Sequence, residues 1–177
     1  MRAFEQFGDE DYVAMSMRNL AYAYWELGDR ERARTLHEEV ARRARAIGNV
    51  HLEGQALGEL AESALEEGRV EEALPPLKKS TQIFVELADP TEIASSLSYF
   101  ARALVLTGRE EAAAQILARA QATFDELGVH WFQPFNPETR KTIQAQLDEA
   151  AYADACARGE DLTLDEAIEL ALESFDR

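Results

Sequence analysis

Apolar residues recur every three or four positions through the first 128 residues, a spacing that places them on one face of a helix. Met17, Leu20, Ala21 and Tyr24 show the pattern in the first segment. No segment of the sequence alternates apolar and polar residues as a half-buried strand does. Together with the glycines and capping residues between them, the periodic segments predict helices over residues 11–27, 30–47, 50–67, 70–87, 90–107 and 110–127. We therefore expect an all-α fold.

The helical pattern repeats with a period of 40 residues. Gly28, Gly68 and Gly108 stand in register, and each opens a related phrase: GDRERA, GRVEEA and GREEAA. Glycine adopts the left-handed conformation that ends many helices without a steric penalty, so each of these glycines is predicted to turn one helix into the next. A lone hairpin leaves its apolar faces uncovered, whereas stacked hairpins bury them. The sequence thus predicts an α-α superhelix, a solenoid of helical hairpins.

The repeat register also gives an organisation for the whole chain as a single domain. We expect a remnant of a preceding repeat at residues 1–9, full repeats at 10–48, 49–88 and 89–128, and a C-terminal cap at 129–177. Phe4 and Phe7 stand forty residues before Ala44 and Ile47, so both are expected to lie on the first hairpin with an exposed outer side. Two explanations of this beginning stay open: a stub that caps the solenoid, or a piece of a longer protein.

Helix starts and breaks can be expected at several further positions. Asp89 followed by Pro90 is typical of a helix start, whereas Pro75 and Pro76 fall beyond the first turn of the fourth predicted helix and should kink or delay it.

After the third repeat the register fails. The phrase NPE at residues 136–138 opens a long helix expected to run to about Ala157, and Gly159 is expected to end it. Thr163 and Glu166 have the spacing of a capping box at the start of a last helix. These helices are expected to form the C-terminal cap.

Three phrases carry a resemblance to a known family: NLAYAYWELGDRERA, ELAESALEEGRVEEA and YFARALVLTGREEAA. They resemble tetratricopeptide (TPR) repeats, which have a large and a small residue in the middle of the first helix, glycine at the turn and alanine in the second helix. The resemblance covers residues 1–128 and implies a tetratricopeptide-like solenoid that binds proteins or peptides.

A narrower resemblance lies near the C-terminus, in AQLDEAAYADACARGEDLTLDEAIELALE. This phrase is similar to the segment that closes the tetratricopeptide region of large bacterial ATP-binding transcriptional regulators of the LuxR and antibiotic-regulator types. It implies a bacterial signalling or transcriptional regulator. The sequence contains no phosphate-binding P-loop phrase, so ATP binding is not carried over to this chain, and neither is DNA binding.

Composition narrows the range of partners. The 177 residues carry 34 acidic and 18 basic side chains, a formal net charge of -16 that disfavours direct binding of nucleic acid. The sequence has one cysteine and no long apolar stretch, so neither a disulfide scaffold nor a membrane span is expected. We expect a cytoplasmic protein.

The sequence offers no set of residues with the spacing that catalysis needs. His37, His51 and His130 have no partners at metal-ligand spacing, and Cys156 has no neighbouring base in sequence. We therefore expect no enzyme activity, no metal and no cofactor.

In tetratricopeptide solenoids the first helix of each hairpin lines a concave groove. Carried over by the resemblance, the partner-binding residues are Met15, Arg18, Tyr22, Trp25, Gln55, Glu62, Ser98 and Arg102. Residues 49–128 hold fourteen acidic and six basic groups, which favours a neutral or basic protein or peptide as partner. Arg42, Arg43 and Arg45 are expected on the solvated convex face. The alternative function is oligomerisation through exposed solenoid ends, so a homo-oligomer is also possible.

Overall fold

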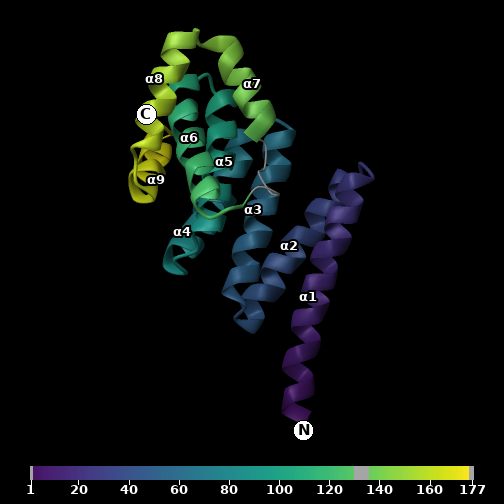
Figure 1. Cartoon of the computed structure of the whole chain (residues 1–177). Coiled ribbons are helices and arrows are strands. Elements are labelled where there is room, and N and C mark those ends of the chain that lie inside the picture. The colour runs from purple at the N-terminus through teal and green to yellow at the C-terminus, as the bar shows by residue number, and fades with distance from the viewer. Residues whose placement is uncertain (1, 130–135, 176–177) are drawn as a thin grey trace. The chain divides into compact units, whose positions relative to one another are not determined.

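The computed structural model describes residues 2–129 and 136–175, with side chains described from residue 10 to 129 and from 137 to 175. Within these residues all regular secondary structure is α-helical (Figure 1). The chain divides into two compact units, residues 1–87 and 88–177, and each is described by itself. The prediction of one domain over residues 1–177 is not tested by this division and stays a prediction.

The first unit contains α1 (Arg2–Glu26), α2 (Arg30–Ile47), α3 (Val50–Glu66) and α4 (Val70–Glu86). Consecutive helices pack in pairs, α1 with α2, α2 with α3 and α3 with α4. Small residues allow these helices to approach closely, because a side chain on Gly54 would bring its Cβ to 2.8 Å from Phe84 Cζ on α4. At the same crossing the Ser80 hydroxyl donates a hydrogen bond to the Gly54 carbonyl oxygen at 2.8 Å.

The second unit contains α5 (Pro90–Leu106), α6 (Glu110–Glu126), α7 (Asn136–Gln146), α8 (Glu149–Glu160) and α9 (Leu164–Glu173). Helices α5 and α6 form a hairpin, α8 packs along α6, and α7 and α9 each contact both members of the hairpin. The core of this unit is large and apolar, with fully buried Leu97, Phe100, Leu104, Ile116 and Phe124. The predicted all-α, tetratricopeptide-like packing of consecutive helices is confirmed.

The predicted helix ends are confirmed at the turns. Gly28, Gly68 and Gly108 have φ values of +80°, +72° and +72°, in the left-handed region that glycine adopts without strain. The turns that separate one repeat from the next lie at Gly48, Ala88 and Gly128, and all three residues have positive φ. Among the residues that the structure describes, Ala88 is the one that has a positive φ, +50°, without being a glycine.

Two predicted capping motifs are also confirmed. The Asp89 side chain accepts hydrogen bonds from the backbone N–H groups of Thr91 and Glu92, at 3.1 and 3.2 Å, and Pro90 is the first residue of α5. Thr163 and Glu166 cap α9 reciprocally, as a capping box requires.

Helix α1 begins earlier than the predicted start at residue 11, and its backbone passes Gly8 without a break. A glycine inside a helix costs about 1 kcal/mol relative to alanine, and a continuous 25-residue helix tolerates it. The side chains of Phe4 and Phe7 lie outside the described residues, so their placement on the first hairpin stays a prediction.

The C-terminal region differs from prediction in two ways. The expected long helix from residue 136 to about 157 is interrupted, because the Asp148 side chain accepts a hydrogen bond from the Ala151 N–H at 2.8 Å and starts α8 as a new helix. Gly159 does not end this helix, which continues to Glu160. Instead, Gly159 packs against the backbone of Gln115 on α6.

The prolines of α4 do not delay its start. Helix α4 begins at Val70 and contains both Pro75 and Pro76. Buried Val70, Ala73 and Leu77 hold the helix on both sides of the prolines, and this packing offsets the backbone hydrogen bonds that the prolines cannot make.

Candidate functional site

Two of the predicted groove residues form an exposed apolar pair on α1. Met15 is 53% and Tyr22 63% exposed. They are seven residues apart, so both side chains project from the same face of the helix. Large exposed apolar side chains at helical spacing are typical of a surface that contacts another molecule. The prediction that these residues bind a partner stays a prediction, and the structure places both where a partner can reach them.

Acidic side chains lie at the Tyr22 end of this pair. The carboxylate of Glu26, which also accepts a hydrogen bond from the phenol, raises the pKa of Tyr22, and the carboxylate of Glu62 on α3 raises it further. Glu66 follows Glu62 by four residues on the same helix and therefore lies on the same side of it. The exposed apolar pair thus has a negatively charged border at Tyr22, and Glu62 is one of the predicted groove residues.

Arg18 connects α1 to α3. Its Nε donates a hydrogen bond to Glu59 Oε1 at 2.6 Å, and Nδ1 of the buried His37 on α2 lies 2.9 Å from Glu59 Oε2. Three helices therefore meet at one carboxylate. The family resemblance predicts Arg18 as a partner-binding residue. It does not predict the contact with Glu59 and His37, because no sequence pattern within α2 or α3 shows that these two side chains converge.

Trp25 is covered by a residue of its own hairpin. The guanidinium carbon of Arg30 lies 3.5 Å from the centre of the Trp25 ring, a cation–π contact, and Arg30 Nη1 donates to the Trp25 carbonyl oxygen at 2.6 Å. Arg30 also pairs with Glu66 at 3.5 Å. Trp25 is half-buried, so a partner reaches one part of it. Gln55 on α3 is likewise half-buried.

The remaining predicted groove residues belong to the second unit. Ser98 on α5 is fully buried, and its hydroxyl donates a hydrogen bond to the Ala94 carbonyl oxygen at 3.1 Å within the same helix. Arg102, one turn further along α5, is half-buried. In the structure Ser98 is a packing residue that presents no surface to a partner, and Arg102 is partly accessible.

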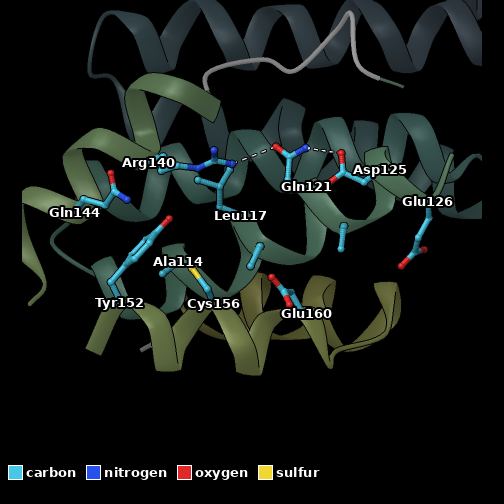
Figure 2. Close-up of a pocket in the computed structure, with 12 residues that line it drawn as sticks. Ala114, Leu117, Gln121, Asp125, Glu126, Arg140, Gln144, Tyr152, Cys156 and Glu160 are labelled. Atoms are coloured by element: carbon cyan, nitrogen blue, oxygen red, sulfur yellow. Dashed lines mark hydrogen bonds between the residues drawn. The ribbon is translucent and has the colours of Figure 1, made fainter. Parts of the chain in front are cut away.

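The second unit contains a cleft of about 710 Å³ that the sequence analysis did not anticipate. Its floor is α6, and its walls are α7 and α8 (Figure 2). Arg140 Nη2 on α7 donates to Gln121 Oε1 at 3.2 Å, and Gln121 Nε2 donates to Asp125 Oδ1 at 3.0 Å (Figure 2). These hydrogen bonds connect the α7 wall to the floor and continue along α6. The cleft depends on the separation of α7 from α8, which the predicted single long helix did not contain.

Tyr152 and Cys156 lie one turn apart on the α8 wall of this cleft (Figure 2). Burial, with a hydrogen bond to the Cys156 thiol as a second cause, raises the pKa of Tyr152 to about 12. The phenol is therefore neutral at physiological pH and available for hydrogen bonding. The functional groups of the cleft are hydrogen-bonding and charged groups suited to recognition of a polar or peptide surface.

Two kinds of feature are absent from the described residues. No helix there is long and apolar enough to cross a membrane. No group of three or more His, Cys, Asp or Glu side chains there is arranged to hold a metal ion.

Comparison with known proteins gives one match. The model of the tetratricopeptide repeat family matches residues 13–51, which contain most of α1, all of α2 and the first residues of α3. No curated protein and no solved structure matches the chain. The match overlaps the first repeat predicted from the 40-residue period, residues 10–48, and supports a tetratricopeptide-repeat domain, a kind of domain that generally mediates protein–protein interaction.

Proposed function

We propose that the chain is a non-catalytic interaction module that binds a neutral or basic peptide segment of a protein partner on the α1–α3 face of its first unit. The observation that carries this proposal is the exposed pair Met15 and Tyr22 with its border of Glu26 and Glu62. The apolar pair supplies contact area, and the carboxylates favour positive charge on the ligand and disfavour acidic ligands.

The proposed setting is a bacterial signalling or transcriptional regulator acting in the cytoplasm. Two features of the sequence support it. The C-terminal phrase resembles the end of the tetratricopeptide region of such regulators, and arginine outnumbers lysine fifteen to three, which is common in proteins from GC-rich bacterial genomes. The net charge of -16 makes nucleic acid a poor direct ligand of this chain.

Peptide arrays test the proposal with defined ligands. Twelve-residue peptides that share two leucines and differ in net charge from -4 to +4 would be titrated against the whole chain at two salt concentrations. Binding is expected for neutral and basic peptides and should weaken with salt for the basic ones. If acidic peptides bind best, the proposed electrostatic selection is wrong.

Matched variants locate the site of binding. Tyr22→Ala and Met15→Ala should each weaken the best peptide by about tenfold, because anchors of this size contribute about 1 to 2 kcal/mol. Val85→Ala removes an exposed apolar side chain from α4 of the same unit and should leave binding unchanged. Arg43→Ala removes a predicted convex residue and is the second control. If Arg43→Ala abolishes binding while Tyr22→Ala and Met15→Ala bind normally, the outer face is the site.

Oligomerisation is the second candidate function. The exposed apolar residues Tyr12, Val13 and Leu20 on α1 favour it, since a second copy can cover them.

A further inference from the structure

Helix α1 carries an apolar stripe that faces solvent. Val13, Ser16, Leu20 and Ala23 follow one another at intervals of three and four residues, and Leu27 continues the spacing just beyond the helix. We call these five residues the outer stripe. All five are exposed, Val13 and Leu20 by 43% and 47%. Intervals of three and four are the spacing by which one helix packs along another.

The repeat register shows what such a face does elsewhere in the first unit. Glu53, Ala56 and Ser63 on α3 stand forty residues after Val13, Ser16 and Ala23, and all three are buried, whereas Leu60 and Glu67, the counterparts of Leu20 and Leu27, are half-buried and exposed. Helix α2 packs on α3 and shares a core cluster with Ala56. The equivalent face of α1 is open in the part of the chain that the structure describes. The fold therefore presents there a surface whose counterpart on α3 is largely covered by a helix between residues 53 and 63.

Large and small residues alternate along the outer stripe, and Ser16 is the small residue between Val13 and Leu20 on this open face. If a second α1 runs antiparallel about a twofold axis near residue 18, Leu20 of each copy faces the small Ser16 of the other. Val13 of each copy then faces Ala23. These layers, formed by the residues from Val13 to Ala23, each pair a large side chain with a small one, as close helix packing requires.

Charge also selects this surface for self-association. Each copy has a net charge of -16, so two copies repel one another over most orientations. The outer stripe itself is uncharged. In the antiparallel arrangement the flanking residues place Asn19 opposite Asn19 and Tyr12 opposite Glu26, so no carboxylate flanking the stripe meets another. The outer stripe has no charged side chain that could pair with a strongly charged partner.

From these observations we propose that two copies of the chain associate through the outer stripe, with their α1 helices antiparallel. The interface has twofold symmetry, the commonest symmetry of soluble homo-oligomers. This inference rests on the second candidate function and not on peptide binding. The two are distinguishable, because the peptide face contains Met15 and Tyr22 and the outer stripe does not.

Sedimentation equilibrium of the whole chain tests the association. The expected mass rises with concentration toward twice the monomer mass of 19.8 kDa. Added salt should strengthen the dimer, because it screens the repulsion between two acidic copies. Leu20→Glu should weaken association at least tenfold, since it places a carboxylate in the apolar interface, while Val85→Glu alters an equally exposed side chain elsewhere and should change nothing. A monomer at all concentrations, or a dimer indifferent to Leu20→Glu, overturns the proposal.

Cross-linking tests the antiparallel geometry. In a Cys156→Ser background, Val13→Cys protein mixed with Ala23→Cys protein should give a mixed disulfide dimer, and each variant alone should give much less. Arg34→Cys, exposed on α2, is the control and should not cross-link. Disulfide dimers formed by Val13→Cys alone and by Ala23→Cys alone, without the mixed species, would show a parallel pair and overturn the arrangement.

Discussion

Gly159 of α8 lies directly against the backbone of Gln115 on α6, so closely that a Cβ on Gly159 would overlap the Gln115 carbonyl group. This crossing holds α8 against the α5–α6 hairpin and thereby sets one wall of the cleft. Close contact between two backbones leaves no side-chain rotamer that could relieve an added methyl group. The helix continues past Gly159 to Glu160, so the glycine does not serve to end it. The close contact with α6 is what requires a glycine at this position.

Gly159→Ala is expected to destabilise the second unit by about 1 to 3 kcal/mol, because one helix must move away from the other. Helix propensity alone predicts the opposite sign, a gain of about 1 kcal/mol for alanine. The free energy of unfolding in urea separates the two effects. Ala157→Gly, the reverse change at an exposed position of α8, gives the scale of the propensity effect. Unchanged or increased stability of Gly159→Ala would contradict the close crossing.

Ala73→Leu tests packing in the first unit. Ala73 on α4 is fully buried, so a larger side chain should cost about 1 to 3 kcal/mol through overpacking. Ala46→Leu makes the same change at an exposed position of α2 and should stay within about 0.5 kcal/mol of the parent. Thermal and urea unfolding measure both variants. Equal stability of the two would show that the repeated alanines do not face a core.

Glu59→Ala tests the three-helix contact at Arg18. Removing this carboxylate takes away the oxygen that lies 2.9 Å from Nδ1 of the buried His37 ring, so a loss of about 1 to 3 kcal/mol is expected. Arg18→Ala should cost less, about 1 kcal/mol or below, because the Arg18 side chain is 36% exposed and water can replace it. Glu38→Ala on the exposed side of α2 is the neutral control. If Arg18→Ala loses more stability than Glu59→Ala, the arginine and not the carboxylate contributes most of the energy of this contact.

The periodic part of the fold was predictable from sequence because its signals are local. Each helix of the repeats shows its own spacing of apolar residues, and Gly28, Gly68 and Gly108 need no information from elsewhere in the chain to end a helix. The C-terminal region was less predictable. Asp148 can either continue one helix or cap the start of a new one, and the packing of α8 on α6, which no local pattern shows, favours the cap. Gly159 illustrates the same limit, because a glycine that ends a helix and a glycine at a crossing look alike in sequence.

The candidate site was predictable only in part. The repeat register places Met15 and Tyr22 on the first helix, and both are exposed. It also places Ser98 in the groove by analogy with earlier repeats, yet the structure buries that side chain. Glu59 and His37 come together from two helices through packing angles that no sequence pattern encodes.

The capping box of α9 gives a pH-dependent contribution to stability. The Thr163 backbone N–H donates to Glu166 Oε2 at 2.8 Å, and the Thr163 hydroxyl lies at the same distance from that oxygen. In return the Glu166 N–H donates to the Thr163 hydroxyl oxygen at 3.2 Å. The hydrogen bond from the Thr163 backbone, followed by that from its side chain, lowers the pKa of Glu166 below its ordinary value of 4.5. The charged carboxylate is therefore favoured in the folded state.

Glu166→Gln should reduce the loss of stability at acid pH. Because the pKa is lower in the folded than in the unfolded state, the stabilisation is complete above 4.5 and disappears as the pH falls through the folded value. Urea midpoints measured from pH 7 to pH 3 should converge for parent and Glu166→Gln at the acid end and differ above it.

Thr163→Ala should lose about 1 kcal/mol of stability at neutral pH, because it removes the N-cap of α9. The loss should be smaller at the acid end, where Glu166 is protonated and its half of the capping box is already weakened. Glu169→Gln, one turn along the same helix and exposed, serves as the charge control. A difference between parent and Glu166→Gln that grows toward low pH would have the wrong sign for a depressed pKa and would contradict stabilisation of α9 by the Glu166 carboxylate.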